Sequence, residues 1–465
     1  MKNVYREKIN ESIGEVYQAG IATKILHYMN KIRNESDITQ ARRWVMELLQ
    51  NARDLAWPDK PLQVQIELRK DALIFRHSGM PFGVDDILSI INQVSSKNPG
   101  EGVGQFGTGF MTTYQLSERV EIRSLLKEEG WPGKEFRIML DRTGHTKEEI
   151  LQAISRNLEE LQKADEFPDV VVREPGTGYD TEFCYMLEND LSRRIAKTGL
   201  TDLADTVLYV MLFSRGIGSV EVTFADGEER ETIVYRRGDC RKRSEHVEEQ
   251  TLIEERVQGT TKIHTFLFMQ EQGMTLAAKY DSERGFLPVS ERTPRIFVDF
   301  PLIGEEPFPF PVVINHLKFE PNDPRSGITL VDNPDSKAAR KNKELLEAAL
   351  GDYEIFMREL LQIDTRGCDN LIGTFEWREN KEWSEAWVKK NLYEGIYKII
   401  EKLPIFPTAQ GMLSLADEFL HIIQSEDPEE KEGIRKLLEP LRGYVAPQDE
   451  TDWYKVLEPY QISDS

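Results

Sequence analysis

One short stretch, "VMELLQNARDLA" at positions 45–56, places polar side chains beside an apolar stripe. A helix turns about 100° per residue, so Glu47, Asn51 and Asp54 lie together along one border of that stripe. A carboxylate and an amide in such a place are suited to a polar site at the edge where a core meets a cleft. Solvated surface is the ordinary alternative for these residues, so other segments must decide between the two.

A glycine-rich segment, "GVGQFGTGF" at 102–110, offers backbone amides to an anion. Gly104, Gly107 and Gly109 carry no Cβ, so the backbone can approach an anion closely. The short helix expected at 108–116 adds exposed amides and the positive end of its dipole. Turns and linkers also collect glycine, so this segment alone is weak support for a binding site.

Two further segments complete the set. "FRHSGMPF" at 75–82 reads as a strand that runs into a glycine turn, and "GTGYDTEFCYM" places Thr181 at the start of another strand. Four such segments in this order support a binding site much more strongly than any one of them alone.

That order resembles the GHKL nucleotide-binding family, which includes gyrase, the ninety-kilodalton heat-shock chaperones, histidine kinases and MutL. The resemblance covers roughly residues 20–190 and is closest to the chaperone branch, and within it to sacsin-like proteins. It is most specific at "ELLQNARD", similar to the family's Glu-x-x-x-Asn helix, and at "GQFGTGF", similar to the chaperone Gly-x-Phe-Gly-x-Gly-Phe loop. The fold implied is the Bergerat α/β sandwich, with ATP held between a helical layer and a lid.

The resemblance implies a role for each of these residues. Glu47 would orient or deprotonate the attacking water, Asn51 would bind Mg²⁺ through its side-chain oxygen, and Asp54 would support the site from behind. The other residues expected to bind the nucleotide are His77, Gly79, Met80, Lys97, Gly104, Gln105, Phe106, Gly107, Thr108, Gly109, Phe110 and Thr181. Lys97 would add a cation to the phosphates, with an ordinary surface lysine as the alternative, and Thr181 would lie behind the base.

The chain departs from the family pattern where the base is read. Most members have Asp-x-Gly-x-Gly, whose aspartate accepts from the adenine amino group, whereas this chain has "HSGMP" at 77–81. A neutral His77 has one acceptor nitrogen and could replace the aspartate in one tautomer. Alternatively, His77 is a buried histidine whose hydrogen bonds are satisfied, and adenine is read by water or backbone.

The function implied is Mg²⁺-dependent ATP binding and slow ATP hydrolysis, which drive lid closure and a rearrangement of domains or of a homodimer or larger assembly. Glu47 favours hydrolysis over the alternative, a non-hydrolysing scaffold or regulatory module. Lys318 or Arg325, in "NHLKFEPNDPRSG", is the candidate for a γ-phosphate contact, with surface charges beside a strand as the alternative. Sacsin-like ATPases also occur in bacterial anti-phage defence systems, so the resemblance extends to that biological setting.

The elements that must position these residues predict an α+β fold. Helices are expected at 5–33 and 38–56, and hairpin-like strand pairs favour α+β over a doubly wound parallel fold. We expect a Bergerat-type ATP-binding domain at 1–215, a second α/β domain at 216–375 and a small, mostly helical unit at 376–465. The last of these resembles sacsin-like proteins at "KLPIFPTAQGMLSL".

Local signals further along the chain add three expectations. The dipeptide Asp-Gly at 226–227, between two alternating runs, predicts a β-hairpin. A long helix is expected at 335–363, and Trp377, Trp383 and Trp387 are spaced for one helix.

Composition limits the partners. Of 465 residues, 81 are acidic and 59 are Lys or Arg, and the net charge of −22 disfavours nucleic acid despite small basic clusters at 235–243 and 337–343. No run of eighteen apolar residues and no apolar leader is present, so a cytoplasmic protein without a membrane span is expected. Cys184, Cys240 and Cys368 lie far apart, which predicts reduced, buried thiols and no metal-ligand pair.

Overall fold

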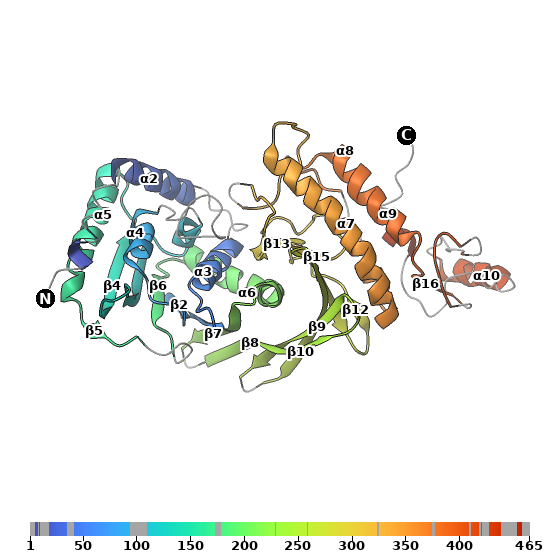
Figure 1. The fold of residues 1–465 in the computed structure, drawn as a ribbon, viewed down its shortest axis with the longest axis horizontal. Coiled ribbons are helices and arrows are strands. Elements are labelled where there is room, and N and C mark those ends of the chain that lie inside the picture. Colours follow the sequence, from blue (N-terminus) through green and yellow to red (C-terminus); the bar gives the residue numbers. More distant parts are fainter. Residues whose placement is uncertain are drawn as a thin grey trace. The chain divides into compact units, whose positions relative to one another are not determined.

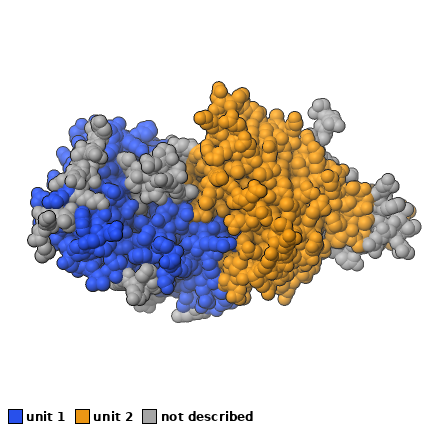
Figure 2. Space-filling model, viewed as in Figure 1, with its two compact units in different colours: residues 1–237, 253–262 blue, residues 238–252, 263–465 orange. Residues whose placement is uncertain are grey.

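The computed structural model describes residues 5–7, 9, 18–34, 41–93, 109–172, 178–227, 229–257, 259–322, 325–373, 377–408, 411–417, 420, 427–438 and 453–457. The chain divides into two compact units (Figure 2). Unit 1 comprises residues 1–237 and 253–262, and unit 2 comprises residues 238–252 and 263–465. The chain passes between them along β8 (Glu229–Lys242), β9 (Val247–Arg256) and β10 (Thr261–Glu271). The three domains expected from the sequence, with boundaries at 215 and 375, stay a prediction.

Unit 1 contains a mixed sheet with the strand order β8-β7-β1-β2-β6-β3-β4-β5 (Figure 1). Its first seven strands along the chain are β1 (Leu62–Leu68), β2 (Ala72–His77), β3 (Arg119–Leu126), β4 (Gly133–Asp141), β5 (Asp169–Val170), β6 (Thr181–Met186) and β7 (Ile217–Asp226). Neighbouring strands run antiparallel except β1 and β7, which are parallel. The sheet is therefore of the α+β kind expected from the sequence.

Helices pack on this sheet. They are α2 (Gln18–Asn34), α3 (Arg43–Asp54), α4 (Val84–Asn92), the 3₁₀-helix η2 (Phe110–Gln115), α5 (Lys147–Leu161) and α6 (Asp190–Phe213). Contacts join α3 to β1, α5 to β4 and α6 to β7. Along β6, Thr181, Phe183 and Tyr185 are buried while the residues between them are half-buried. This alternation is typical of a sheet that is covered on one face and open on the other.

The less buried side of the strands carries charged side chains that pair across the sheet. Arg76 Nε lies 2.7 Å from Glu182 Oε2, and Arg123 Nη2 lies 2.9 Å from Glu135 Oε1. These pairs join β2 to β6 and β3 to β4, and opposite charges facing each other in this way add modestly to sheet stability.

Helix α3 is fixed by its neighbour α6. The indole Nε1 of Trp44 donates to the carbonyl of Ile195 at 3.3 Å. The indole lies so close to Gly199 that a Cβ there would approach Trp44 Cε2 to 2.7 Å. Arg42, just before the helix, pairs with Asp202 at 2.9 Å. These contacts set the rotation of α3 about its axis, and so determine which way its polar border faces.

Unit 2 has the strand order β14-β13-β15-β11-β10-β9, followed by a long helix and shorter elements. The strands after β10 are β11 (Met274–Asp281), β12 (Gly285–Leu287), β13 (Ile296–Val298), β14 (Phe300–Pro301), β15 (Val313–Asn315), β16 (Phe406–Thr408) and β17 (Gly411–Leu413). The α-helices of unit 2 are α7 (Lys337–Ile363), α8 (Glu385–Trp387), α9 (Glu394–Ile400), α10 (Pro428–Leu438) and α11 (Trp453–Leu457). Two further short helices of unit 2 are η4 (Cys368–Leu371) and η5 (Val388–Tyr393), and unit 1 also contains the short helix η3 (Ala164–Glu166).

Two local expectations are confirmed and one is wrong. The hairpin at 226–227 joins β7 to β8, and α7 covers the long helix expected at 335–363. The three tryptophans do not share a helix: Trp383 precedes α8 and packs edge-on against Phe308, with ring centroids 5.2 Å apart. Burial against a distant aromatic ring has overridden the local helical spacing there.

The expected thiol environment is also only partly correct, because Cys240 is exposed whereas Cys368 is buried and Cys184 is half-buried. The basic cluster at 235–243 is largely paired, since Arg241 and Arg243 both contact Glu249. Among the described residues, no helix combines the length and apolar character required to cross a membrane.

Candidate functional site

The polar border of α3 is largely enclosed. Asn51 is only 5% exposed, and its amide nitrogen has no hydrogen-bond partner among the described residues. Glu47 and Asp54 are half-buried, and Asp54 Oδ1 lies 3.3 Å from Arg53 Nε. A buried amide without a partner loses its hydration and gains nothing in return, and such a group is normally satisfied by protein, water or a ligand.

The last glycine of the glycine-rich segment lies against the carboxylate of Glu47. A Cβ added to Gly109 would overlap Glu47 Oε2 and would lie 2.7 Å from its Cδ. Gly109 immediately precedes η2, and the hydroxyl of Thr112 donates to the Gly109 carbonyl at 2.8 Å. Only glycine leaves room for the carboxylate here, so two of the four sequence segments meet at this contact.

The short helix expected at 108–116 is a 3₁₀-helix over Phe110–Gln115. Thr112 and Thr113 donate from their hydroxyls to the carbonyls three residues earlier, Gly109 and Phe110, at 2.8 Å each. Bonds to carbonyls three residues back favour the tighter 3₁₀ winding.

The turn "HSGM" is attached to the end of α3. The backbone N–H of Met80 donates to the carbonyl of Leu55, the residue that follows α3, at 2.7 Å. A Cβ on Gly79 would come within 2.8 Å of the same carbonyl oxygen. The third segment is thereby held against the helix that carries Glu47 and Asn51.

A row of polar residues crosses the otherwise apolar face of the sheet. His77 on β2 stands opposite Thr181 on β6, and the Thr181 hydroxyl lies 2.6 Å from that of Ser124 on β3. Each of the three side chains is only 1% exposed. His77 and Thr181 are predicted from the sequence, whereas Ser124 is not. The signal was available, because Ser124 follows Val120 and Ile122 at alternate positions of a strand, where an apolar residue is expected.

The ring of His77 has a defined tautomer. Its Nδ1 accepts from the backbone N–H of Gly79 at 3.2 Å, so in the neutral ring Nε2 carries the proton. Burial lowers the pKa of His77 to about 3, which keeps the ring neutral at physiological pH. The acceptor expected to read the adenine amino group is therefore engaged by Gly79, and His77 could take that role only by giving up this bond. That expectation stays a prediction.

The remaining expected residues fall into three groups. Phe110 is buried and its ring lies 5.9 Å from that of Phe183, on the same face as the polar row. Lys97, Gly104, Gln105, Phe106, Gly107 and Thr108 lie outside the described residues. Lys318 and Arg325 belong to unit 2.

Those two residues of unit 2 differ in their surroundings. Lys318 is exposed. Arg325 has a φ of 66°, a conformation uncommon for any residue but glycine, asparagine or aspartate. The side-chain oxygen of Asn322 accepts from the backbone N–H groups of Ser326 and Gly327 at 2.9 and 3.0 Å.

The residues of α3 fit Mg²⁺ that is held mainly by phosphate and water. No cluster of three or more His, Cys, Asp or Glu side chains suited to a metal occurs among the described residues. Mg²⁺ commonly takes only one or two protein oxygens beside substrate phosphates. The side chains of Glu47 and Asn51, one turn apart on α3, supply oxygen donors of that kind.

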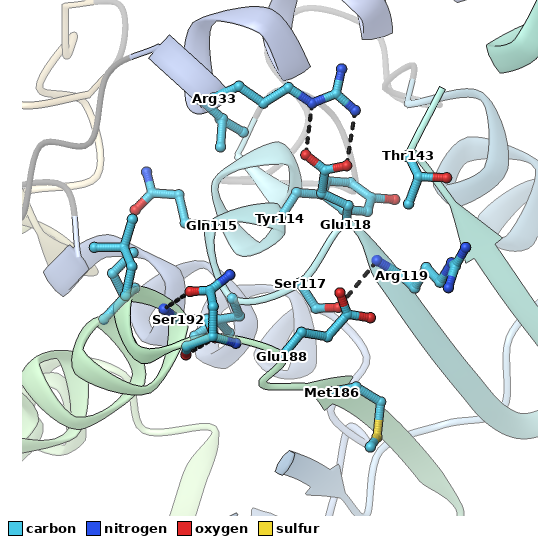
Figure 3. Close-up of a pocket in the computed structure, with 15 residues that line it drawn as sticks. Arg33, Tyr114, Gln115, Ser117, Glu118, Arg119, Thr143, Met186, Glu188 and Ser192 are labelled. Carbon is cyan, nitrogen blue, oxygen red and sulfur yellow. Dashed lines mark hydrogen bonds and ion pairs between the residues drawn. The ribbon is translucent and has the colours of Figure 1, made fainter. Parts of the chain in front are cut away.

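A separate cavity of about 270 Å³ lies at the other end of β6 (Figure 3). Its lining includes Met186, whereas the polar row is at Thr181. Figure 3 shows the guanidinium of Arg33 facing the carboxylate of Glu118, with two contacts of 2.7 and 2.9 Å. Met186 and Thr181 are the two ends of β6, so this cavity is separate from the site formed by the four segments.

Comparison with known proteins gives no family. No protein-family model matches the chain, and no curated protein matches it. The functional assignment therefore depends on the geometry of the described residues and on the four sequence segments.

Proposed function

We propose that this chain is an ATPase of the GHKL type, which binds Mg·ATP in unit 1 and hydrolyses it slowly. The observation that carries the proposal is the contact between Glu47 and Gly109. It places a carboxylate at the end of a glycine-rich segment, beside the buried amide of Asn51. Phosphoryl transfer depends mostly on positioning and charge stabilisation, for which such a set is suited.

The residues divide the work as follows. Glu47 orients the attacking water and accepts its proton. Asn51 would hold Mg²⁺ through its side-chain oxygen, and the ion, when bound, would neutralise charge on the phosphate oxygens. The backbone around Gly109 approaches the phosphates closely because no Cβ intervenes. The buried row that includes Thr181 and Ser124 supplies hydroxyl groups on the sheet face.

The architecture supports a Bergerat-type sandwich for unit 1. The sheet is buried on the side where the polar row lies, and helices pack against it. Thr181 on β6 and the turn after β2 fall at the same end of the sheet, since His77 and Thr181 are paired. This arrangement suits a nucleotide whose base lies over the strand ends and whose phosphates lie near α3.

The proposal also includes a change of assembly. Closure over bound ATP would rearrange the later domains or bring two copies of the chain together, as the resemblance implies. A Glu47→Ala protein saturated with Mg·ATP should then show a larger apparent mass by light scattering than the nucleotide-free protein. An unchanged mass would keep ATP binding but remove the dimer from the proposal.

The decisive experiment compares binding with turnover. Calorimetry should detect Mg·ATP binding to the wild type and to Glu47→Gln, which keeps the size and polarity of the side chain. Phosphate release should fall by about 100-fold or more in Glu47→Gln, the order of a lost general base. Binding without phosphate release by the wild type would favour a scaffold that uses ATP as a structural ligand, and equal turnover in the two proteins would remove Glu47 from catalysis. No binding by the wild type would refute the proposal.

A further inference from the structure

Arg142 is a fully buried cation that the proposed chemistry does not use. It follows β4 directly and is 0% exposed. Among the described residues it forms no ion pair with a carboxylate, and its Nε has no hydrogen-bond partner. Burying a guanidinium is costly unless other groups compensate for the lost water. The groups that do so show what Arg142 connects.

Its first partner is the end of α4. Nη2 of Arg142 donates to the carbonyl of Ile91, in the last turn of α4, at 2.7 Å. The last carbonyls of a helix lack partners within the helix and lie at the negative end of its dipole. A buried guanidinium is therefore stabilised at this point without a carboxylate. Nη1 adds a bond to the Asp141 carbonyl at 3.2 Å.

Its second partner is η2. The guanidinium carbon of Arg142 lies 6.0 Å from the ring centroid of Tyr114, within the range of a cation–π interaction. Tyr114 is itself only 2% exposed and packs edge-on against Phe110, the first residue of η2. The ring contact therefore extends from Arg142 to the helix that Gly109 precedes.

The backbone of Arg142 is held as well. Its N–H donates to the Glu118 carbonyl at 2.9 Å, and its own carbonyl accepts from Arg33 Nη2 at 2.8 Å. Arg33 in turn donates two hydrogen bonds to the Glu118 carboxylate, as Figure 3 shows. With both backbone and side chain fixed, Arg142 has little freedom to follow a movement of α4 or η2.

We propose that Arg142 is a positioning residue for turnover: by joining the last turn of α4 to η2, it sets where Gly109 presses on the Glu47 carboxylate. This inference rests on the proposed ATPase function. Arg142 touches neither Glu47 nor Gly109 directly, and its effect passes through Tyr114 and Phe110. Positioning errors of about 1 Å can lower a rate by about 100-fold without removing any reacting group.

The test uses Arg142→Met and Arg142→Lys in the full chain. Methionine fills similar space without the charge or the donors, so it removes the bond to Ile91 and the ring contact with Tyr114 together. Lysine keeps the charge but can reach only one of the two partners. We expect kcat to fall by about 10-fold to 100-fold in Arg142→Met and by less in Arg142→Lys, with KM for ATP nearly unchanged.

The matched control is Arg119→Met. Arg119 is half exposed, with a side-chain exposure of 51%, and it pairs with Asp141 at 3.5 Å on the neighbouring strand. The Arg119→Met variant also loses a guanidinium, but not one that joins α4 to η2. Its kcat should therefore equal that of the wild type.

A second readout does not depend on hydrolysis. Amides of η2 and of the last turn of α4 should exchange with deuterium faster in Arg142→Met, while those of β4 should be unchanged. Unaltered exchange in η2 together with unaltered kcat would overturn the role of Arg142. If exchange is faster in Arg142→Met but the wild type does not hydrolyse ATP, Arg142 still joins α4 to η2 and the ATPase function is refuted.

Discussion

The carboxylate of Glu47 occupies the space that a side chain on Gly109 would fill. A Cβ there would overlap Oε2 and approach Cδ to 2.7 Å. The two residues are far apart in the sequence and belong to two different segments of the four that carry the resemblance. The contact between Glu47 and Gly109 can therefore be tested by measuring stability and turnover in variants of the two residues.

Gly109→Ala should destabilise the fold and nearly abolish turnover, because the methyl group displaces the Glu47 carboxylate. Overpacking of this kind costs about 1–3 kcal/mol. In a Glu47→Ala background the same change should cost much less, since the obstructing group is gone. Urea unfolding of the four proteins of this double-mutant cycle measures the difference.

The control for that cycle is Gly20→Ala. Gly20 lies in α2 and a Cβ there would meet no atom within 4 Å. Alanine in a helix is favoured over glycine by about 1 kcal/mol, so this variant should be more stable than the wild type. Additive costs for Gly109→Ala and Glu47→Ala would show that the two residues do not press on one another.

Asn51→Ala should abolish Mg·ATP binding while leaving the free energy of unfolding nearly unchanged. The Asn51 amide nitrogen has no partner to lose among the described residues. Asn157 offers a matched control: it is equally buried, at 4% exposed, but its Nδ2 donates to the Met139 carbonyl at 2.8 Å. Asn157→Ala should therefore cost about 1–3 kcal/mol of stability and leave binding intact.

Calorimetry with Mg·ATP and urea unfolding on both variants check this contrast. A large loss of stability in Asn51→Ala with intact nucleotide affinity would make Asn51 a structural residue. That result would also remove the metal ligand from the proposed function.

His77 should make the fold sensitive to acid. Burial lowers its folded-state pKa to about 3 from an ordinary value of 6.5. Its contribution to stability is present above pH 6.5 and is lost as the pH falls toward 3, because the unfolded chain gains a proton that the native ring refuses. In His77→Asn the side-chain oxygen can still accept from Gly79, and nothing titrates. The free energy of unfolding should thus fall less steeply between pH 6.5 and 4 in this variant.

The low pKa of His77 also predicts how the affinity for Mg·ATP depends on pH. Because His77 stays neutral above pH 5, Mg·ATP affinity should not change with pH between 5.5 and 8 on its account. If the free energy of unfolding depends on pH equally in the wild type and in His77→Asn, the ring of His77 is more accessible to protons than its burial implies. A loss of affinity on acidification that vanishes in His77→Asn would place the ring at the base.

The sequence was informative where a property is local and periodic. Glu47 and Asn51 share a border because helical spacing fixes it, and β1 and β2 follow from alternation across a short turn. Glu47 and Gly109 are in contact only because the folded chain brings two distant segments together. No local sequence pattern encodes that contact. Arg142 carries no local signal for the same reason: its partners are a helix end and an aromatic ring far away in the sequence.

Glu305 in unit 2 should give the opposite pH dependence to His77. Its carboxyl is 1% exposed, and burial raises its pKa to about 8. Oε1 accepts from the Ile328 N–H at 2.7 Å. The neighbouring acids Glu306 and Glu382 also oppose its ionisation. A protonated Glu305 is therefore part of the native fold at neutral pH.

Its contribution to stability is fully present below pH 4.5 and is lost as the pH rises through about 8, because the unfolded chain releases a proton that the native state keeps. Glu305→Gln retains the oxygen that accepts from Ile328 and is neutral at every pH. Relative to the wild type, it should gain more stability at pH 8.5 than at pH 5 in urea unfolding. The exposed Glu344→Gln should change both values alike. A Glu305→Gln effect that is the same at both pH values would mean that Glu305 is already ionised in the native protein at pH 5.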